Sequence, residues 1–115
     1  MEYRRFGNTI YLRLDPKEEI LEEIGKVAEK ENIRLAQVTG LGAINDFTAG
    51  VYNTVTKKYH SIQFQGAFEI VSLTGTVTRK DGDVYLHLHI AAGDEEGRNG
   101  IRHLGLTYKV AFKIQ

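Results

Sequence analysis

The sequence predicts an α+β fold in which an antiparallel β-sheet of about six to seven strands packs with one main α-helix. Two observations carry this prediction: one amphipathic helical pattern near the N-terminus, and a series of period-two strand patterns after it. The length of 115 residues suits a single domain over 1–115, with no linker or internal repeat. A hydrophobic content of 42% is enough for one core.

The helix is predicted over about 16–31. Asp15 can accept a hydrogen bond as the N-cap, and Pro16 suits the first helical position because its missing N–H needs no partner there. Glu18 follows Asp15 at the spacing of a capping box, and Asn32 can end the helix. The apolar stripe of the helix consists of Ile20, Leu21, Ile24, Val27 and Ala28.

The strands are expected over 9–14, 33–38, 47–52, 59–64, 68–78, 83–92 and 104–114. Asp81-Gly82 is a two-residue hairpin signal, and Asn53–Lys58 has the composition of a longer hairpin loop. A turn is expected over Thr39–Ala43 and a polar loop over Gly93–Gly100. Gly75 lies inside a strand pattern, which indicates a bulge or a close approach of another backbone.

Composition excludes several classes of function. The 15 basic and 15 acidic residues give zero formal net charge, so the basic excess of a protein that binds nucleic acid directly is missing. The absence of cysteine excludes disulfides, thiolate metal sites and cysteine nucleophiles. No stretch approaches ~20 consecutive apolar residues, and no signal region precedes the first strand, so a cytoplasmic protein without a membrane partner is expected.

Histidines supply the strongest chemical signal. His87 and His89 lie two apart in a strand pattern, so they share one face of the sheet. His103 begins the last expected strand and could return beside them, which would make an open three-histidine site for zinc or another divalent metal. The alternative is a set of solvated histidines, or histidines that are hydrogen-bonded in a subunit interface. His60 belongs to a polar hairpin, where surface exposure is expected.

Glu69 lies between Phe68 and Ile70 in an otherwise apolar strand, where a buried carboxylate would need a partner. Apolar residues at both parities of this strand predict burial on both faces, either by the helix and a second sheet or by a partner subunit. Glu69 could act as a general acid or base beside a metal-bound water. The favoured alternative is a salt bridge or hydrogen bond, for example to Arg102.

Several short segments follow one another in a characteristic order: Tyr11–Pro16, Gly40–Ala43, Gly66–Gly75, Asp81-Gly82, Leu86–His89 and His103-Leu104. The order of these segments resembles the PPC domain (Plants and Prokaryotes Conserved) over essentially the whole chain. This resemblance implies a compact α+β fold with an antiparallel sheet and a homotrimeric assembly. Plant members join the domain to AT-hook motifs, but this chain lacks an Arg-Gly-Arg core and is similar to the stand-alone prokaryotic type.

The fold that the resemblance implies is similar to that of α-acetolactate decarboxylase, which holds zinc with an H-x-H pair and a later histidine. His87, His89 and His103 match this arrangement in type and order. The chain departs from the usual PPC pattern around the third histidine, because Gly100-Ile101-Arg102 replaces a Gly-Gly and Leu104-Gly105 replaces a longer Leu-Glu-Gly-type stretch.

Two functions therefore stay open from the sequence. The first is a homotrimer with a three-histidine divalent-metal pocket that receives a small-molecule ligand. The second is a non-catalytic protein-association module linked to DNA-binding or transcription-related complexes. The sequence does not decide whether the protein is an enzyme.

Overall fold

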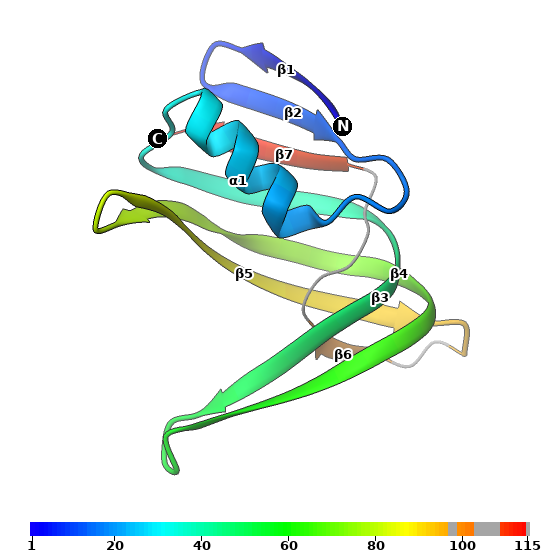
Figure 1. Ribbon diagram of the computed structural model, residues 1–115. Coiled ribbons are helices and arrows are strands. Elements are labelled where there is room, and N and C mark those ends of the chain that lie inside the picture. Colours follow the sequence, from blue (N-terminus) through cyan, green and yellow to red (C-terminus); the bar gives the residue numbers. More distant parts are fainter. Residues whose placement is uncertain (97–98, 103–108, 115) are drawn as a thin grey trace.

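The computed structural model describes residues 1–96, 99–102 and 109–114, with side chains over 1–96 (Figure 1). Its elements are β1 (Glu2–Phe6), β2 (Thr9–Arg13), α1 (Ile20–Lys30), β3 (Ala36–Asn53), β4 (Lys58–Lys80), β5 (Asp83–Asp94), β6 (Asn99–Arg102) and β7 (Lys109–Ile114). The strands form one sheet in the order β1-β2-β7-β3-β4-β5-β6, with antiparallel neighbours throughout. The expected α+β class, a mostly antiparallel sheet with one helix, is confirmed.

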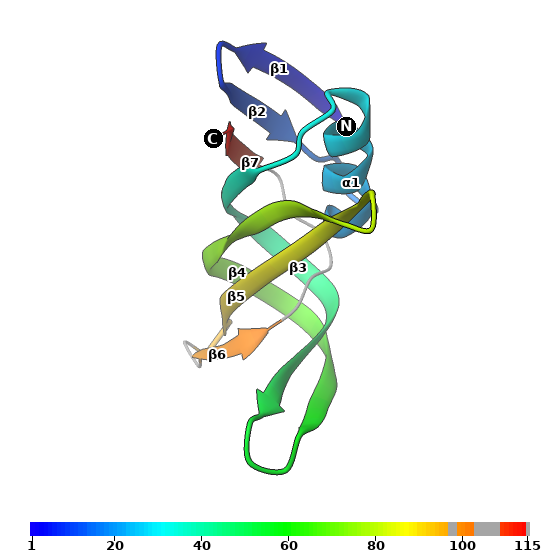
Figure 2. The ribbon, with the colours of Figure 1, turned by 90° about the vertical axis from the view of Figure 1, so that its left-hand side faces the viewer.

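Helix α1 covers one face of the sheet, and the other face has no covering layer among the described elements (Figures 1 and 2). The apolar stripe of α1 is buried, together with the strand residues that alternate toward it. We call the uncovered side the open face. No helix in the described ranges is long and apolar enough to span a bilayer. The core residues with the largest buried side chains are Ile10, Leu12, Leu14, Ile20, Ile24, Ile33, Leu73 and Ile90.

The predicted start of the helix is wrong by four residues. Lys17 has a φ of 75°, which a right-handed helix does not allow, so the chain makes a turn before α1 begins. The backbone N–H of Asp15 donates to the Glu18 carboxylate at 2.7 Å, so the contact expected of a capping box stabilises this turn instead. Glu19 is the N-cap, and its side chain accepts from the backbone N–H of Glu22 at 2.8 Å.

Arg79 ties the C-terminal end of α1 to the sheet. Asn32 has a φ of 50° and ends the helix as expected. The Arg79 guanidinium donates to the carbonyl oxygens of Ile33 at 3.0 Å and Ala28 at 3.3 Å, and it forms an ion pair with Glu29 at 3.1 Å. One planar side chain therefore joins the carbonyl of Ala28, which also accepts from the backbone N–H of Ile33 at 2.9 Å, to the Ile33 carbonyl that follows the helix.

The turn predicted over Thr39–Ala43 is not present, because β3 continues through it. The two glycines mark a register shift between Gly40 and Gly42, and Gly42 has a φ of 145°. The expected strands on either side are thus one bent strand, and β4 is likewise continuous, with Gly66 at a φ of 134° opposite a second shift. These irregularities turn the distal part of both strands, residues 46–65, into an arm that extends from the sheet (Figure 1).

Two other expectations also need correction. Strand β1 was not predicted because its sequence, EYRRF, lacks an alternating apolar pattern, which an edge strand does not require. The predicted loop over Gly93–Gly100 is shorter than expected, since β5 runs to Asp94 and β6 begins at Asn99. The last strand was expected over 104–114; β7 covers Lys109–Ile114, and 103–108 lie outside the described residues.

The two short-range signals in the hairpin between β4 and β5 are confirmed. Asp81 and Gly82 have φ values of 53° and 88°, as the expected two-residue turn requires. Gly75 lies opposite Leu88, and a Cβ built on Gly75 would collide with the carbonyl oxygen of His87. The same Cβ would approach the Leu88 Cα to 2.7 Å, so only glycine fits this position.

We expect Gly75→Ala to lower the free energy of unfolding by about 2 kcal/mol, because the added methyl group must displace the β5 backbone. Chemical denaturation measures the change. Gly25→Ala is the matched control, since its Cβ would contact nothing within 4 Å in the middle of α1. The control should stabilise the protein by roughly 0.5–1 kcal/mol. Equal effects for the two variants would contradict the close approach.

We expect Arg79→Lys to lower the free energy of unfolding by about 1–3 kcal/mol, although the charge is kept. A lysine ammonium cannot reach the separate acceptors that the guanidinium bridges, so the carbonyl oxygens of Ile33 and Gly82 lose this donor. Thermal and urea unfolding measure the loss, with exposed Arg34→Lys as the control. A change below ~0.5 kcal/mol, the range of ordinary surface substitutions, would show that Arg79 does not hold α1.

Candidate histidine site on the open face

Strand β5 presents two histidines on the open face. Leu88 and Ile90 are buried, and the alternation of the strand turns His87 and His89 to the opposite side, where both are exposed. Both histidines lie opposite threonines of β4, since His87 pairs with Thr76 and His89 with Thr74. The shared face expected from the sequence is confirmed for this pair.

The two imidazoles lie in direct contact. The Nε2 atoms of His87 and His89 are 3.0 Å apart, and the ring centroids are separated by 5.0 Å. This separation fits an N–H···N hydrogen bond in which one ring donates and the other accepts. It is also close to the geometry of a metal site, because two nitrogens each ~2.0–2.1 Å from a tetrahedral zinc ion are about 3.3 Å apart.

A third ligand is needed to complete a metal site. Within the ranges that the structure describes, no group of three His, Asp or Glu side chains could hold a metal ion. His103, the expected third ligand, lies outside the described residues. The described chain approaches the pair nevertheless, since β6 pairs with β5 and Arg102 lies opposite Ile90, the residue after His89.

Glu69 does not lie beside the histidine pair. It pairs with Gly93, four residues beyond His89 on β5, which corresponds to about 13 Å along the strand. The Glu69 side chain is exposed in the single chain, so no described helix or strand buries it, and burial by a partner subunit stays a prediction. It borders a hollow of about 380 Å³ near the end of β5, together with Asp94 and Glu95. His60 lies on the arm and is exposed, as expected.

The open face also exposes large apolar side chains. Val71, at a register shift in β4, is 67% exposed, and Tyr11 and Leu41 are exposed to 60% and 59%. The arm adds further apolar surface at its sides and tip, with Val55 exposed to 87%. Apolar surface of this extent is typical of a site of protein association. The exposed apolar residues of the arm are Val51, Tyr52, Val55, Tyr59 and Ile62.

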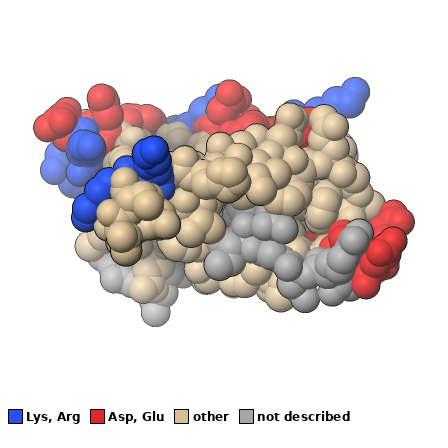
Figure 3. Space-filling model, turned by 90° about the horizontal axis from the view of Figure 1, so that it is seen from below, with Lys and Arg blue, Asp and Glu red and all other residues tan. Residues whose placement is uncertain are grey.

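Seen from below relative to Figure 1, the described Lys and Arg side chains do not form a continuous basic stripe. Figure 3 shows acidic and basic groups together at one end and along the upper edge of this view, acidic groups at the other end, and a broad uncharged surface between them. A surface that binds the phosphate backbone needs clustered Lys and Arg side chains. The arrangement on this side therefore agrees with the zero net charge of the sequence.

A second hollow on the open face was not found from the sequence. It measures about 560 Å³ and lies between β1–β2 and β3, bordered by Arg4, Tyr11 and Leu41 among others. These residues come from separate parts of the sequence. They border one hollow because β7 pairs with both β2 and β3 and so joins them in one sheet. The sequence does not indicate this hollow, because Arg4 and Phe6 belong to β1, which lacks an alternating apolar pattern.

Comparisons with known proteins identify similar chains. The family model of the Plants and Prokaryotes Conserved (PCC) domain matches residues 1–114. None of the curated proteins compared with the chain matches it. The similar solved structures give the same fold over nearly the whole chain.

A candidate DNA-binding protein from Bacteroides thetaiotaomicron is 26% identical, with a TM-score of 0.90 over 99% of this chain and 82% of that one. A plant- and prokaryote-conserved protein from Pyrococcus horikoshii is 29% identical, with a TM-score of 0.83 over 99% and 81%. A protein from Archaeoglobus fulgidus that is described as metal-containing is 25% identical, with a TM-score of 0.85 over 98% and 81%.

Proposed function

Because this chain belongs to the Plants and Prokaryotes Conserved (PPC) domain family, we propose that it forms a homotrimer whose subunits each hold a divalent metal ion, zinc in the first instance, with His87, His89 and His103. The observation that carries the proposal is the contact between the His87 and His89 Nε2 atoms at 3.0 Å on the open face. A zinc ion would require these atoms to separate by only a few tenths of an ångström.

The described end of β6 supports the inclusion of His103. Arg102 lies opposite Ile90, and His103 follows Arg102 directly in the sequence. A similar structure from Archaeoglobus fulgidus is described as metal-containing, which supports a metal in this fold. A divalent ion held by three imidazoles would keep a position for water or a carbonyl oxygen and would supply Lewis-acid chemistry. Glu69 receives no role in proton transfer, because it lies about 13 Å along the strand.

The homotrimer is supported by the exposed apolar surface of the open face and the arm. Val71 and the exposed apolar side chains of the arm would leave water if a neighbouring subunit covered them. Zero net charge means that copies of the chain meet little electrostatic repulsion.

The metal proposal predicts one equivalent of zinc per chain in protein purified without an affinity tag. The double variant His87→Ala, His89→Ala should lose this zinc, because two of three ligands are removed, and His103→Ala should weaken binding at least tenfold. Elemental analysis and competition with a chromophoric chelator measure both. His60→Ala is the control, since this histidine lies on the arm. Zinc retention by the double variant would refute the pocket.

The trimer proposal predicts a solution mass three times that of the 13.0 kDa chain. Val71→Glu should shift the protein to a lower mass, because it introduces a charge into the proposed interface, while folding of the single chain is kept. Sedimentation velocity measures the mass and circular dichroism the folding. Glu22→Lys on the exposed side of α1 is the control. A monomer at all concentrations in the unchanged protein would contradict the proposal.

The alternative function is a non-catalytic association module linked to DNA-binding complexes. A similar structure described as a candidate DNA-binding protein keeps this alternative in view. This alternative also requires subunit association through the open face, but it gives the histidines no role. Protein that forms the trimer yet binds no zinc would favour the alternative, and salt-dependent retention of duplex DNA by the chain alone would indicate direct DNA binding instead.

A further inference from the structure

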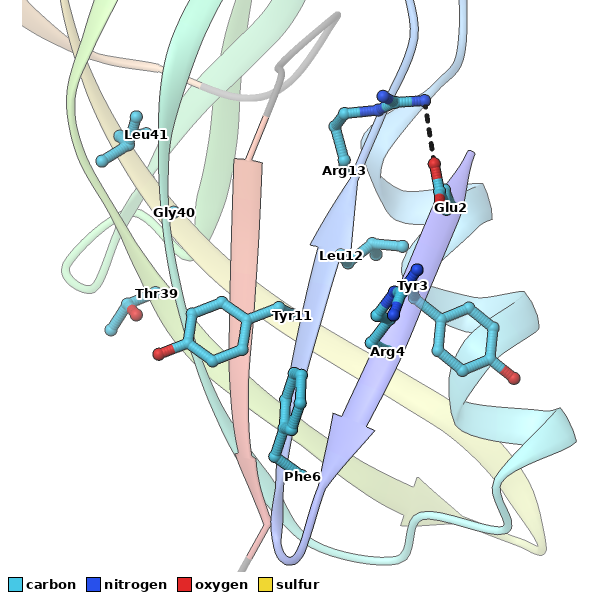
Figure 4. Close-up of a pocket in the computed structure, with 10 residues that line it drawn as sticks. All are labelled: Glu2, Tyr3, Arg4, Phe6, Tyr11, Leu12, Arg13, Thr39, Gly40 and Leu41. Carbon is cyan, nitrogen blue, oxygen red and sulfur yellow. Dashed lines mark ion pairs between the residues drawn. The ribbon is translucent and has the colours of Figure 1, made fainter.

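The second hollow of the open face has the size and lining of a small-molecule site (Figure 4). Its volume of about 560 Å³ lies within the range of ligand pockets, roughly 300–1,000 Å³. Its walls come from β1, β2 and β3, and β7 passes between β2 and β3 with Ala111 in register with both Tyr11 and Thr39.

The apolar part of the hollow is preformed. Phe6 and Tyr11 pack edge to face, with ring centroids 6.1 Å apart and an interplanar angle of 71°. Figure 4 shows the Tyr11 ring extending toward Thr39, with Leu41 farther along the same strand. Since Phe6, Tyr11 and Leu41 are all more than half exposed, an apolar ligand placed between them would remove a large apolar area from water.

The charges around the hollow do not balance locally. The Glu2 carboxylate forms an ion pair with Arg13 at 3.4 Å, and Arg13 also contacts Asp15 at 3.3 Å. Arg4 borders the same hollow from β1, yet it makes no ion pair with any residue in the described part of the chain. Among the described side chains, the Arg4 guanidinium on this side of the molecule therefore has no carboxylate partner.

We propose that this hollow binds a small organic carboxylate with an aromatic or branched aliphatic body. The body lies between Tyr11 and Leu41, and the carboxylate pairs with the guanidinium of Arg4. Planar guanidinium and carboxylate groups match in a two-bond arrangement, which supplies orientation as well as affinity. The apolar walls alone would accept many ligands, so Arg4 determines the chemical class.

The proposed site borders the histidine pair without depending on it. Thr39 lies opposite Thr74, and Thr74 lies opposite His89. Thr39 and His89 are therefore two strands apart, a total distance of ~10 Å. Arg4 lies at the other side of the hollow, opposite Tyr11. Loss of metal binding and loss of carboxylate binding can therefore be distinguished by separate variants.

The test uses 3-phenylpropionate, its uncharged amide 3-phenylpropionamide, and titration followed by ligand-observed NMR on the whole chain. The acid should bind, and the amide should bind at least about tenfold more weakly, because it lacks the charge that pairs with Arg4. Arg4→Gln should weaken binding of the acid by about tenfold or more and leave the amide unchanged. Arg34→Gln is the control, since it removes the same charge from an exposed position outside the hollow.

Tyr11→Ala should weaken the acid and the amide alike, because it removes part of the apolar wall. The variant His87→Ala, His89→Ala should bind the acid as the unchanged protein does, so failure of the metal proposal leaves this one standing. Equal binding of acid and amide, or an unaffected Arg4→Gln, would overturn the assignment of Arg4. No binding of the acid at millimolar concentration would overturn the site itself. This outcome is also expected if a second copy of the chain fills the hollow and excludes the ligand.

Discussion

The packing of α1 against one face of the sheet determines the orientation of the strand residues that follow. Once Ile20, Ile24 and Val27 are buried, the alternation of each strand sends every second residue to the same core and its neighbours to the open face. Arg79 fixes the helix in this position from the sheet side, because it donates to the carbonyl oxygens of Ala28 in α1, of Ile33 after it, and of Gly82 in the hairpin of β4 and β5. The histidines, the aromatic wall of the hollow and Arg4 all face outward as a consequence.

Local signals in the sequence were sufficient where one residue type is required for a steric reason. The Asp81-Gly82 turn needs two positive φ values, Gly75 lies against the β5 backbone, and Asn32 ends α1 in the left-handed region. The shared face of His87 and His89 follows from the period of a strand and nothing else. These features depend on neighbours within one strand or one hairpin, which is why the sequence alone could predict them.

Features that depend on long-range placement were missed or misread. Gly40 and Gly42 have the composition of a turn, but pairing with β4 on one side and β7 on the other keeps the strand continuous, so the glycines become an irregularity. The hollow could not be inferred because β7, from the end of the chain, separates β2 from β3. The apolar neighbours of Glu69 led to the expectation of burial on both faces of the strand. In the described chain, however, no helix or strand covers Glu69 or the exposed Val71.

The open face carries exposed apolar side chains for subunit association and polar side chains for ligand binding on the same strands. The strand register places these two kinds of side chain at different positions. Exposed Val71 lies at a shift in β4, between the row that carries the histidine pair and the base of the arm. A neighbouring subunit that contacts this ridge and the arm would lower the local dielectric around the imidazoles, which strengthens any charge interaction there. The hollow near Arg4 extends from β3 across β7 to the N-terminal strands β1 and β2. Desolvation of Arg4 without an anion would be costly, so an assembly that covers this side as well would have to supply a carboxylate of its own.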